Sequence, residues 1–91
     1  MASPSTLAAE DLRAIEGLLG LRLVEVSVRD ARPETRLRFN SPVEVVAWTL
    51  QARAVCPDGR IYAGEIELFQ WPRDGWELVQ ENLSPVQPLR G

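Results

Sequence analysis

The spacing of apolar residues along the chain changes at Gly20. Over residues 7–19 they recur every three or four positions, which predicts one amphipathic helix. Ser5 or Thr6 is expected to cap the start of this helix, because a hydroxyl oxygen accepts the free N–H groups of a first turn. Gly20 occupies the position at which a left-handed residue commonly ends a helix.

After Gly20 the period becomes two, which is the spacing of half-buried strands. Valines alternate with polar residues in RLVEVSVRD, residues 22–30, and Leu37 and Phe39 alternate with arginines in TRLRFN, residues 35–40. We expect two strands here, joined by a turn across DARPE, residues 30–34.

The tripeptide Pro57-Asp58-Gly59 predicts a three-residue hairpin loop with Gly59 in the left-handed conformation. If Cys56 then lies opposite Arg60, one face of the flanking strands becomes wholly apolar and the other polar. A shift of one residue would scatter polar side chains over both faces. The expected cross-strand pairs are Ala54 with Tyr62, Ala52 with Gly64, Leu50 with Ile66 and Trp48 with Leu68.

A helix is the alternative for residues 41–56. Ser41 fits an N-cap, Pro42 fits the first helical position and Glu44 completes a capping box. We favour a strand over residues 44–56, because the turn chemistry and the side-chain alternation agree on one register.

A second hairpin is expected around Pro72 and the pair Asp74-Gly75, with a last strand from Trp76 onward. The sequence does not fix the register of this hairpin. The predicted fold class is α+β, an N-terminal amphipathic helix packed on one face of a four- to five-stranded antiparallel β-meander.

The chain is expected to form one small domain over residues 1–91, with tails at 1–5 and 85–91. The apolar sheet face carries three small residues, and small residues let a helix backbone approach a sheet closely. These residues are Ala52, Ala54 and Gly64.

A chain of 91 residues with 45% hydrophobic residues and a formal net charge of −3 is typical of a small globular protein with a modest core. Self-association is therefore expected. The single cysteine allows no internal disulfide, and the N-terminal sequence lacks both a basic start and a long apolar run. We expect a cytoplasmic protein with no membrane segment.

Histidine and lysine are absent, and all ten basic residues are arginine. The chain therefore lacks the commonest general base, the commonest metal ligand and a Schiff-base amine. We expect no cofactor, no metal and no catalytic residue, so that an enzyme is the less favoured class. The arginine bias and the seven prolines fit a GC-rich, heat-adapted bacterial source.

Cys56 is interpreted as a small apolar side chain beside the turn, since no histidine can act as its base and only Arg60 could stabilise a thiolate. A rival function, a small ligand-binding protein or enzyme, would use Glu65, Glu67 and Arg53. The two glutamates share a strand face, as carboxylates around a cation or a scissile bond do. Alternating glutamates on a solvated strand look the same, and we favour that interpretation.

Four arginines are concentrated in one short stretch of the chain, and guanidinium groups bind phosphates well. They are Arg29, Arg32, Arg36 and Arg38. Asp30 and Glu34 interrupt the stretch, and the sequence pI of about 4.9 is opposite to that of most nucleic-acid binders. Anion or nucleic-acid binding is therefore a minor alternative.

Trp48 is expected in the core, whereas Trp71 and Trp76 flank the second turn and are expected to form an aromatic patch with Phe69. Aromatic residues beside arginines are typical of binding hot spots. Burial of these tryptophans against the helix or a tail is the alternative. The favoured function is a non-catalytic binding and assembly module that forms a homodimer through a sheet edge or the outer sheet face. The candidate interaction residues are Trp71, Trp76, Phe69, Arg36, Arg38, Arg53, Glu65 and Glu67.

Overall fold

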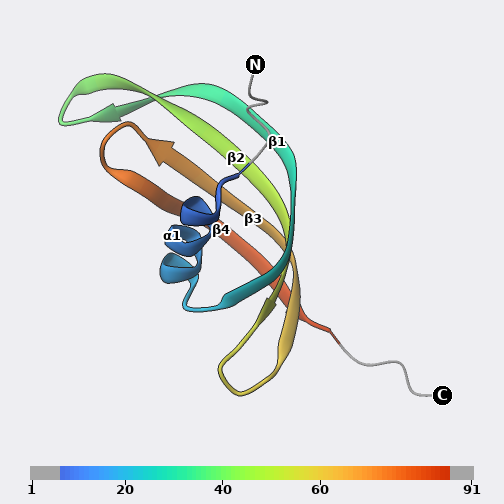
Figure 1. Ribbon diagram of the computed structural model, residues 1–91. Helices are drawn as coiled ribbons and strands as arrows, with labels where there is room; N and C mark the ends of the chain where they lie inside the picture. The colour runs from blue at the N-terminus through green and yellow to red at the C-terminus, as the bar shows by residue number, and fades with distance from the viewer. Residues whose placement is uncertain (1–6, 87–91) are drawn as a thin grey trace.

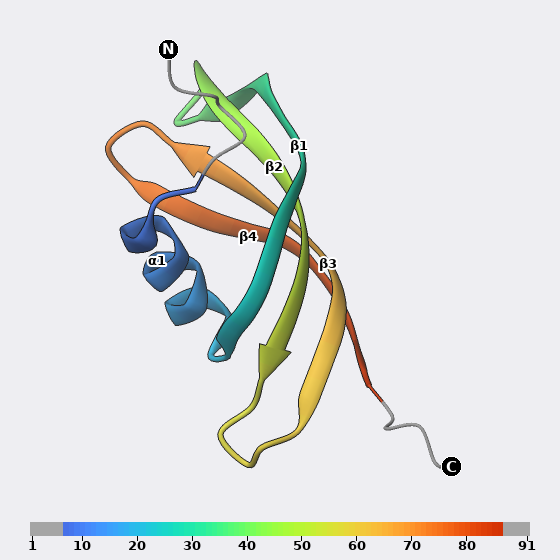
Figure 2. The same ribbon diagram turned by 45° about the vertical axis from the view of Figure 1, so that its right-hand side comes forward.

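A computed structural model describes residues 7–86 and shows one helix followed by four strands. The elements are α1 (Ala9–Leu19), β1 (Arg22–Arg38), β2 (Ser41–Val55), β3 (Ile61–Trp71) and β4 (Gly75–Pro85). The strands form a single antiparallel sheet in the order β1-β2-β3-β4. The sheet is strongly curved, and α1 lies against one face of it (Figure 1, Figure 2). The α+β class and the antiparallel meander are thus as predicted.

The expected fifth strand does not form, because residues 22–30 and 35–40 belong mostly to the one strand β1. The stretch DARPE lies inside β1, where Pro33 pairs with Val46. β1 is an edge strand of the sheet. Proline has no N–H to donate to a neighbouring strand, and this is tolerated on an edge strand, which has a neighbour on one side only. The chain reverses instead at Phe39 and Asn40, whose φ angles of 52° and 63° are those of a two-residue type I′ turn.

The hairpin between β2 and β3 has the predicted turn and register. Gly59 has a φ of 92°, its N–H donates to the carbonyl of Cys56 at 2.9 Å, and Cys56 N–H donates to the carbonyl of Arg60 at 2.8 Å. Leu50 pairs with Ile66, and the other three expected pairs are also present. Residues 41–55 are therefore a strand, and the helical alternative is wrong.

The core lies on the face of the sheet that α1 covers, here called the inner face. Leu50 and Ile66 are both 0% exposed, and Ile15 of α1 is buried against them. Each full burial of such a side chain contributes about 1.5–3 kcal/mol. The buried cluster consists of Ile15, Trp48, Leu50, Ala52, Ile66 and Leu68.

Both ends of α1 are satisfied by local hydrogen bonds. Gly20 has a φ of 69° and donates its N–H to the carbonyl of Glu16 at 2.8 Å, as a left-handed cap does. The Glu16 carboxylate accepts the N–H of Leu23 at 2.8 Å, which ties the helix to the start of β1. At the other end Ala8 offers no side-chain oxygen, and Asp11 accepts the Ala8 N–H at 3.2 Å. The predicted caps Ser5 and Thr6 lie outside the described residues.

Gly64 is required by the neighbouring strand and not, as expected, by a close approach of the helix. A Cβ atom added at Gly64 would lie 2.1 Å from the carbonyl oxygen of Asn82 and 3.1 Å from Cα of Leu83, both in β4. These are backbone atoms held in the β3–β4 ladder, where Gly64 pairs with Leu83. A side chain at this position would therefore force the two strands apart.

We predict that Gly64→Ala lowers the free energy of unfolding by about 3 kcal/mol, since overpacking against backbone cannot be relieved by a rotamer change. Gly17→Ala is the matched control, because nothing lies within 4 Å of a Cβ at that helical position. It is expected to raise the free energy of unfolding by about 0.5–1 kcal/mol. Urea denaturation measures both values, and equal effects of the two substitutions would contradict the close approach of β4.

Candidate interaction surface

The face of the sheet opposite α1, here called the outer face, carries every candidate interaction residue except Trp76. In β3 the residues Glu65, Glu67 and Phe69 alternate with the buried inner-face residues and pair with Gln51, Thr49 and Ala47. Trp76 lies on the inner face, with its ring centroid 5.8 Å from that of Trp48. The predicted aromatic patch is therefore divided between the two faces.

Phe69 and Trp71 meet two arginines of β1 on the outer face. The guanidinium carbon of Arg38 lies 3.9 Å from the centroid of the Trp71 ring, and that of Arg36 lies 4.9 Å from the centroid of Phe69. Both distances are within the range of a cation–π contact. We call these four residues, Arg36, Arg38, Phe69 and Trp71, the aromatic–arginine cluster.

The cluster holds two hairpins together. The β1–β2 turn and the β3–β4 turn lie near each other at one end of the curved sheet, and the β2–β3 turn lies at the other end (Figure 1, Figure 2). Arg38 also pairs with Asp74 in the β3–β4 turn, and Trp71 Nε1 donates to Glu77 Oε1 at 2.7 Å. Trp71 is consequently only 8% exposed although it faces away from α1.

An open depression of about 430 Å³ adjoins the cluster. It lies between the end of β1 and the start of the β3–β4 hairpin, and its walls are apolar rings with charged groups beside them. The lining residues are Thr35, Arg36, Leu37, Phe69, Trp71 and Glu77.

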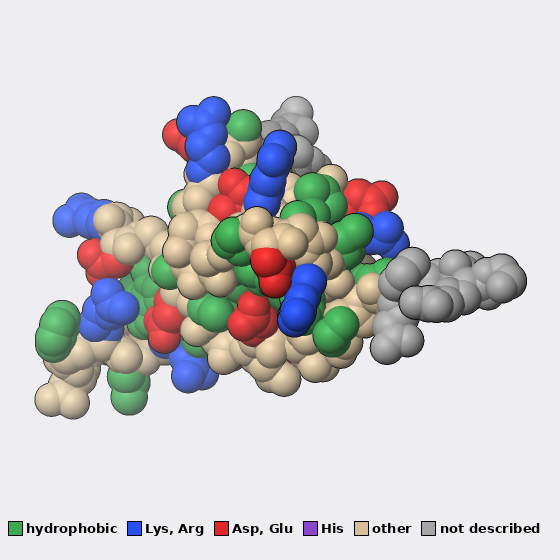
Figure 3. Space-filling model, turned by 90° about the horizontal axis from the view of Figure 1, so that it is seen from below, with side chains coloured by type: hydrophobic (Ala, Val, Ile, Leu, Met, Phe, Trp, Pro, Cys, Tyr) green, Lys and Arg blue, Asp and Glu red, His purple; other side chains and the backbone are tan. Residues whose placement is uncertain are grey.

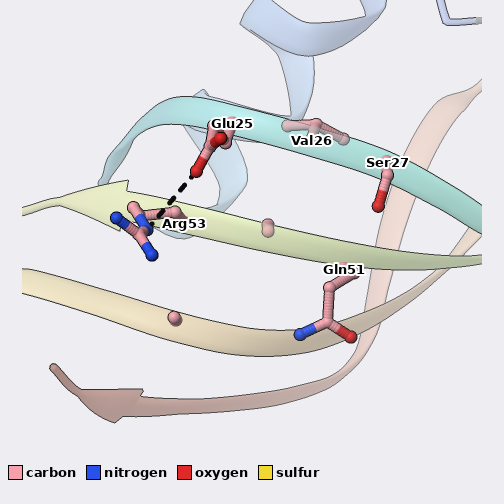
Figure 4. Close-up of a pocket in the computed structure, with 7 residues that line it drawn as sticks. Glu25, Val26, Ser27, Gln51 and Arg53 are labelled. Carbon is pink, nitrogen blue, oxygen red and sulfur yellow. Dashed lines mark ion pairs between the residues drawn. The ribbon is translucent and has the colours of Figure 1, made fainter.

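The other three candidate residues lie on the outer face but do not join this cluster. Arg53 Nε is 3.4 Å from Glu25 Oε1 across β1 and β2, and it is diagonal to Glu65 in the register. Figure 4 shows the side chains of Arg53 and Glu25 pointing toward each other. They line a shallow depression of about 280 Å³, and Ser27 and Gln51 lie further along it. Neither Glu65 nor Glu67 lines this depression, so Arg53 is the one candidate residue of the three that does.

This depression gives the rival function little support. Its charged side chains are on the face opposite α1, so no pocket between helix and sheet encloses them. Among residues 7–86 no group of three or more acidic, cysteine or histidine residues could hold a metal ion. Arg60, the residue considered for stabilising the Cys56 thiolate, instead has its Nε 3.3 Å from an Asp58 carboxylate oxygen.

The arginines of the RDARPETRLR stretch are interleaved with carboxylates and do not form a continuous basic surface within the described residues. Arg32 is 3.6 Å from Asp30, and Arg36 is 3.7 Å from Glu34. Arg29 donates to the amide oxygen of Gln51 at 3.4 Å. Figure 3 shows acidic and basic side chains intermixed over the visible face.

Sequence reasoning missed the exposure of two large apolar side chains at the end of β1. Leu37 is 74% exposed and Phe39 is 94% exposed, although their alternation with arginines predicted a half-buried strand. The available signal was Asn40, because Asn tolerates the positive φ of a two-residue turn and so marks the chain reversal.

Comparisons with protein-family models, with curated protein sequences and with solved structures find no match to this chain. Within the part of the chain that the structure describes, no helix has the length and apolar character needed to cross a membrane.

We predict that Arg38→Ala lowers the free energy of unfolding by about 1–2 kcal/mol, because it uncovers the Trp71 ring and leaves Asp74 unpaired. Arg53→Ala is the matched control, since it removes the same charge from a half-exposed ion pair worth about 0.5 kcal/mol or less. Denaturation of both variants in dilute solution measures the difference. Equal losses of unfolding free energy in the two variants would show that Arg38 stabilises the fold through its charge alone.

Proposed function

We propose that this chain is a non-catalytic binding and assembly module that works as a cytoplasmic homodimer, with the aromatic–arginine cluster at its interface. The observation that supports this proposal most is the convergence of Phe69, Trp71, Arg36 and Arg38 at one end of the outer face. Tryptophan and arginine are enriched among the residues that contribute most to binding at protein interfaces. Leu37 and Phe39 add exposed apolar surface at the same end of the sheet.

The sheet edges are less suited to pairing than the outer face. β1 contains bulges at Val24 and Arg29 and also carries Pro33, and β4 contains a bulge at Val79. Bulges and prolines on edge strands are common devices that prevent edge-to-edge pairing. The outer face is therefore the surface that we assign to self-association.

The size of the protein gives a physical reason for dimerisation. The chain has 91 residues, and its main buried cluster lies on the inner face of one sheet. Domains of this size bury a smaller share of their surface than larger ones, so that burial of a second apolar area adds appreciably to stability. Apolar area removed from water contributes about 25 cal/mol per Å².

Sedimentation over a wide range of protein concentration tests the proposal. We predict that the mass rises from that of the 10.2 kDa chain to twice this value. Arg36→Glu is expected to weaken association at least about tenfold, because it places a carboxylate beside Glu34 and Glu77 at the interface. Arg13→Glu makes the same charge change on the exposed side of α1 and is expected to leave association unchanged.

A chain that stays monomeric at every concentration would overturn the proposal. Equal weakening by the two charge reversals would place the interface away from the outer face.

A further inference from the structure

The Phe39 side chain makes almost no packing contact within residues 7–86. Phe39 is the first residue of the β1–β2 turn, is 94% exposed, and stands next to the pair formed by Arg38 and Ser41. Large apolar side chains that are exposed together frequently mark an interaction site. Leu37, which is 74% exposed, extends the same apolar tip.

The backbone conformation of Phe39 is a second, independent observation. Its φ of 52° lies in the left-handed region, where a bulky side chain is strained and asparagine or glycine is tolerated. A two-residue turn optimised for folding would carry Asn-Gly, whereas this chain has Phe39-Asn40. Strain of this kind persists mainly at functional sites.

The depression beside the aromatic–arginine cluster is next to this tip. Its volume of about 430 Å³ is larger than a phenyl ring requires, and Leu37 forms part of its wall. Phe69 and Trp71 supply aromatic walls, and Glu77 supplies a carboxylate. Because Phe39 is almost fully exposed, it does not fill the depression of its own chain.

We propose that Phe39 of each protomer inserts into this depression of the other protomer, so that two copies form a reciprocal, two-fold interface. This inference rests on the proposed self-association and specifies its geometry. A surface that carries a projecting side chain beside a depression can pair with a copy of itself. When two copies are related by a two-fold axis, each side chain enters the depression of the other copy.

Charge complementarity favours a second copy as the occupant. Arg36 and Glu77 both line the depression, so that two facing copies bring a guanidinium group of one opposite a carboxylate of the other. A strongly basic or acidic partner would instead meet a like charge from one of these two residues.

The area agrees with a dimer that forms and dissociates reversibly with concentration. A buried phenylalanine removes about 150–250 Å² from water, and the walls that it contacts lose a similar area. Two reciprocal insertions therefore bury about 600–1,000 Å² in all, which is the size of a weak, reversible interface.

Phe39→Asn tests the inference, because it should change association and stability in opposite directions. Asparagine relieves the strain of the turn, so denaturation at a concentration below the dissociation constant is expected to show a higher unfolding midpoint. The dissociation constant of the dimer is expected to rise at least about tenfold. Leu18→Asn is the matched control, since Leu18 is an exposed apolar residue of α1 and its replacement should leave the dissociation constant unchanged.

Cross-linking between chains supplies a second test in a Cys56→Ala background. A chain carrying Phe39→Cys is mixed with a chain carrying Glu77→Cys, and mild oxidation is expected to join the two, because Glu77 lines the depression and pairs with Phe69 on the same face. A wild-type dimer that Phe39→Asn leaves intact, with no such cross-link, would overturn the inference while the proposed function stands. A wild-type chain that never dimerises would overturn both.

Discussion

The register between β2 and β3 is the constraint on which the rest of the structure depends. The loop of Pro57, Asp58 and Gly59 aligns the two strands so that Leu50 meets Ile66, and both are fully buried. A slip of one residue would turn one strand over, so that Leu50 would meet a glutamate of β3 and Gln51 would meet Ile66, which would leave polar groups in the core without partners. The same alternation that directs Leu68 under α1 directs Phe69 and Trp71 to the outer face. The composition of the outer face is therefore a consequence of how the core is built.

The curvature of the sheet gives the outer face its local structure. β1 continues well beyond the segment that contacts α1, and its last residues reach the β3–β4 turn, where Arg38 contacts both Trp71 and Asp74. The guanidinium groups of Arg36 and Arg38 cover aromatic rings that would otherwise be exposed. This arrangement keeps the cluster ordered in the single chain and leaves its depression open. An ordered surface loses little conformational entropy on association, which favours binding.

Local chemistry made much of the fold predictable, and contacts between distant residues explain what was missed. Gly20 correctly marks the end of α1, and Gly59 correctly marks the β2–β3 hairpin. Both positions need a positive φ, which glycine adopts readily. The stretch DARPE has the residue types of a turn but lies inside β1. Its proline is tolerated because β1 is an edge strand, and that position depends on the whole sheet. The separation of Trp71 from Trp76 depends on the register of a turn in which Arg73 has a φ of 75°. The meeting of Arg36 with Phe69 depends on sheet curvature, and no spacing within the sequence encodes it.

One face of the sheet is covered by α1, and we propose that the other is completed by a second chain. The three tryptophans test it directly, because their indole N–H signals in NMR spectra can be assigned by single replacements with phenylalanine. Trp48 and Trp76 lie on the inner face, and Trp71 lies in the aromatic–arginine cluster. As the protein concentration rises, the Trp71 signal is expected to shift while the signals of Trp48 and Trp76 stay in place. A shift confined to Trp48 or Trp76, or no shift in any of the three, would contradict it.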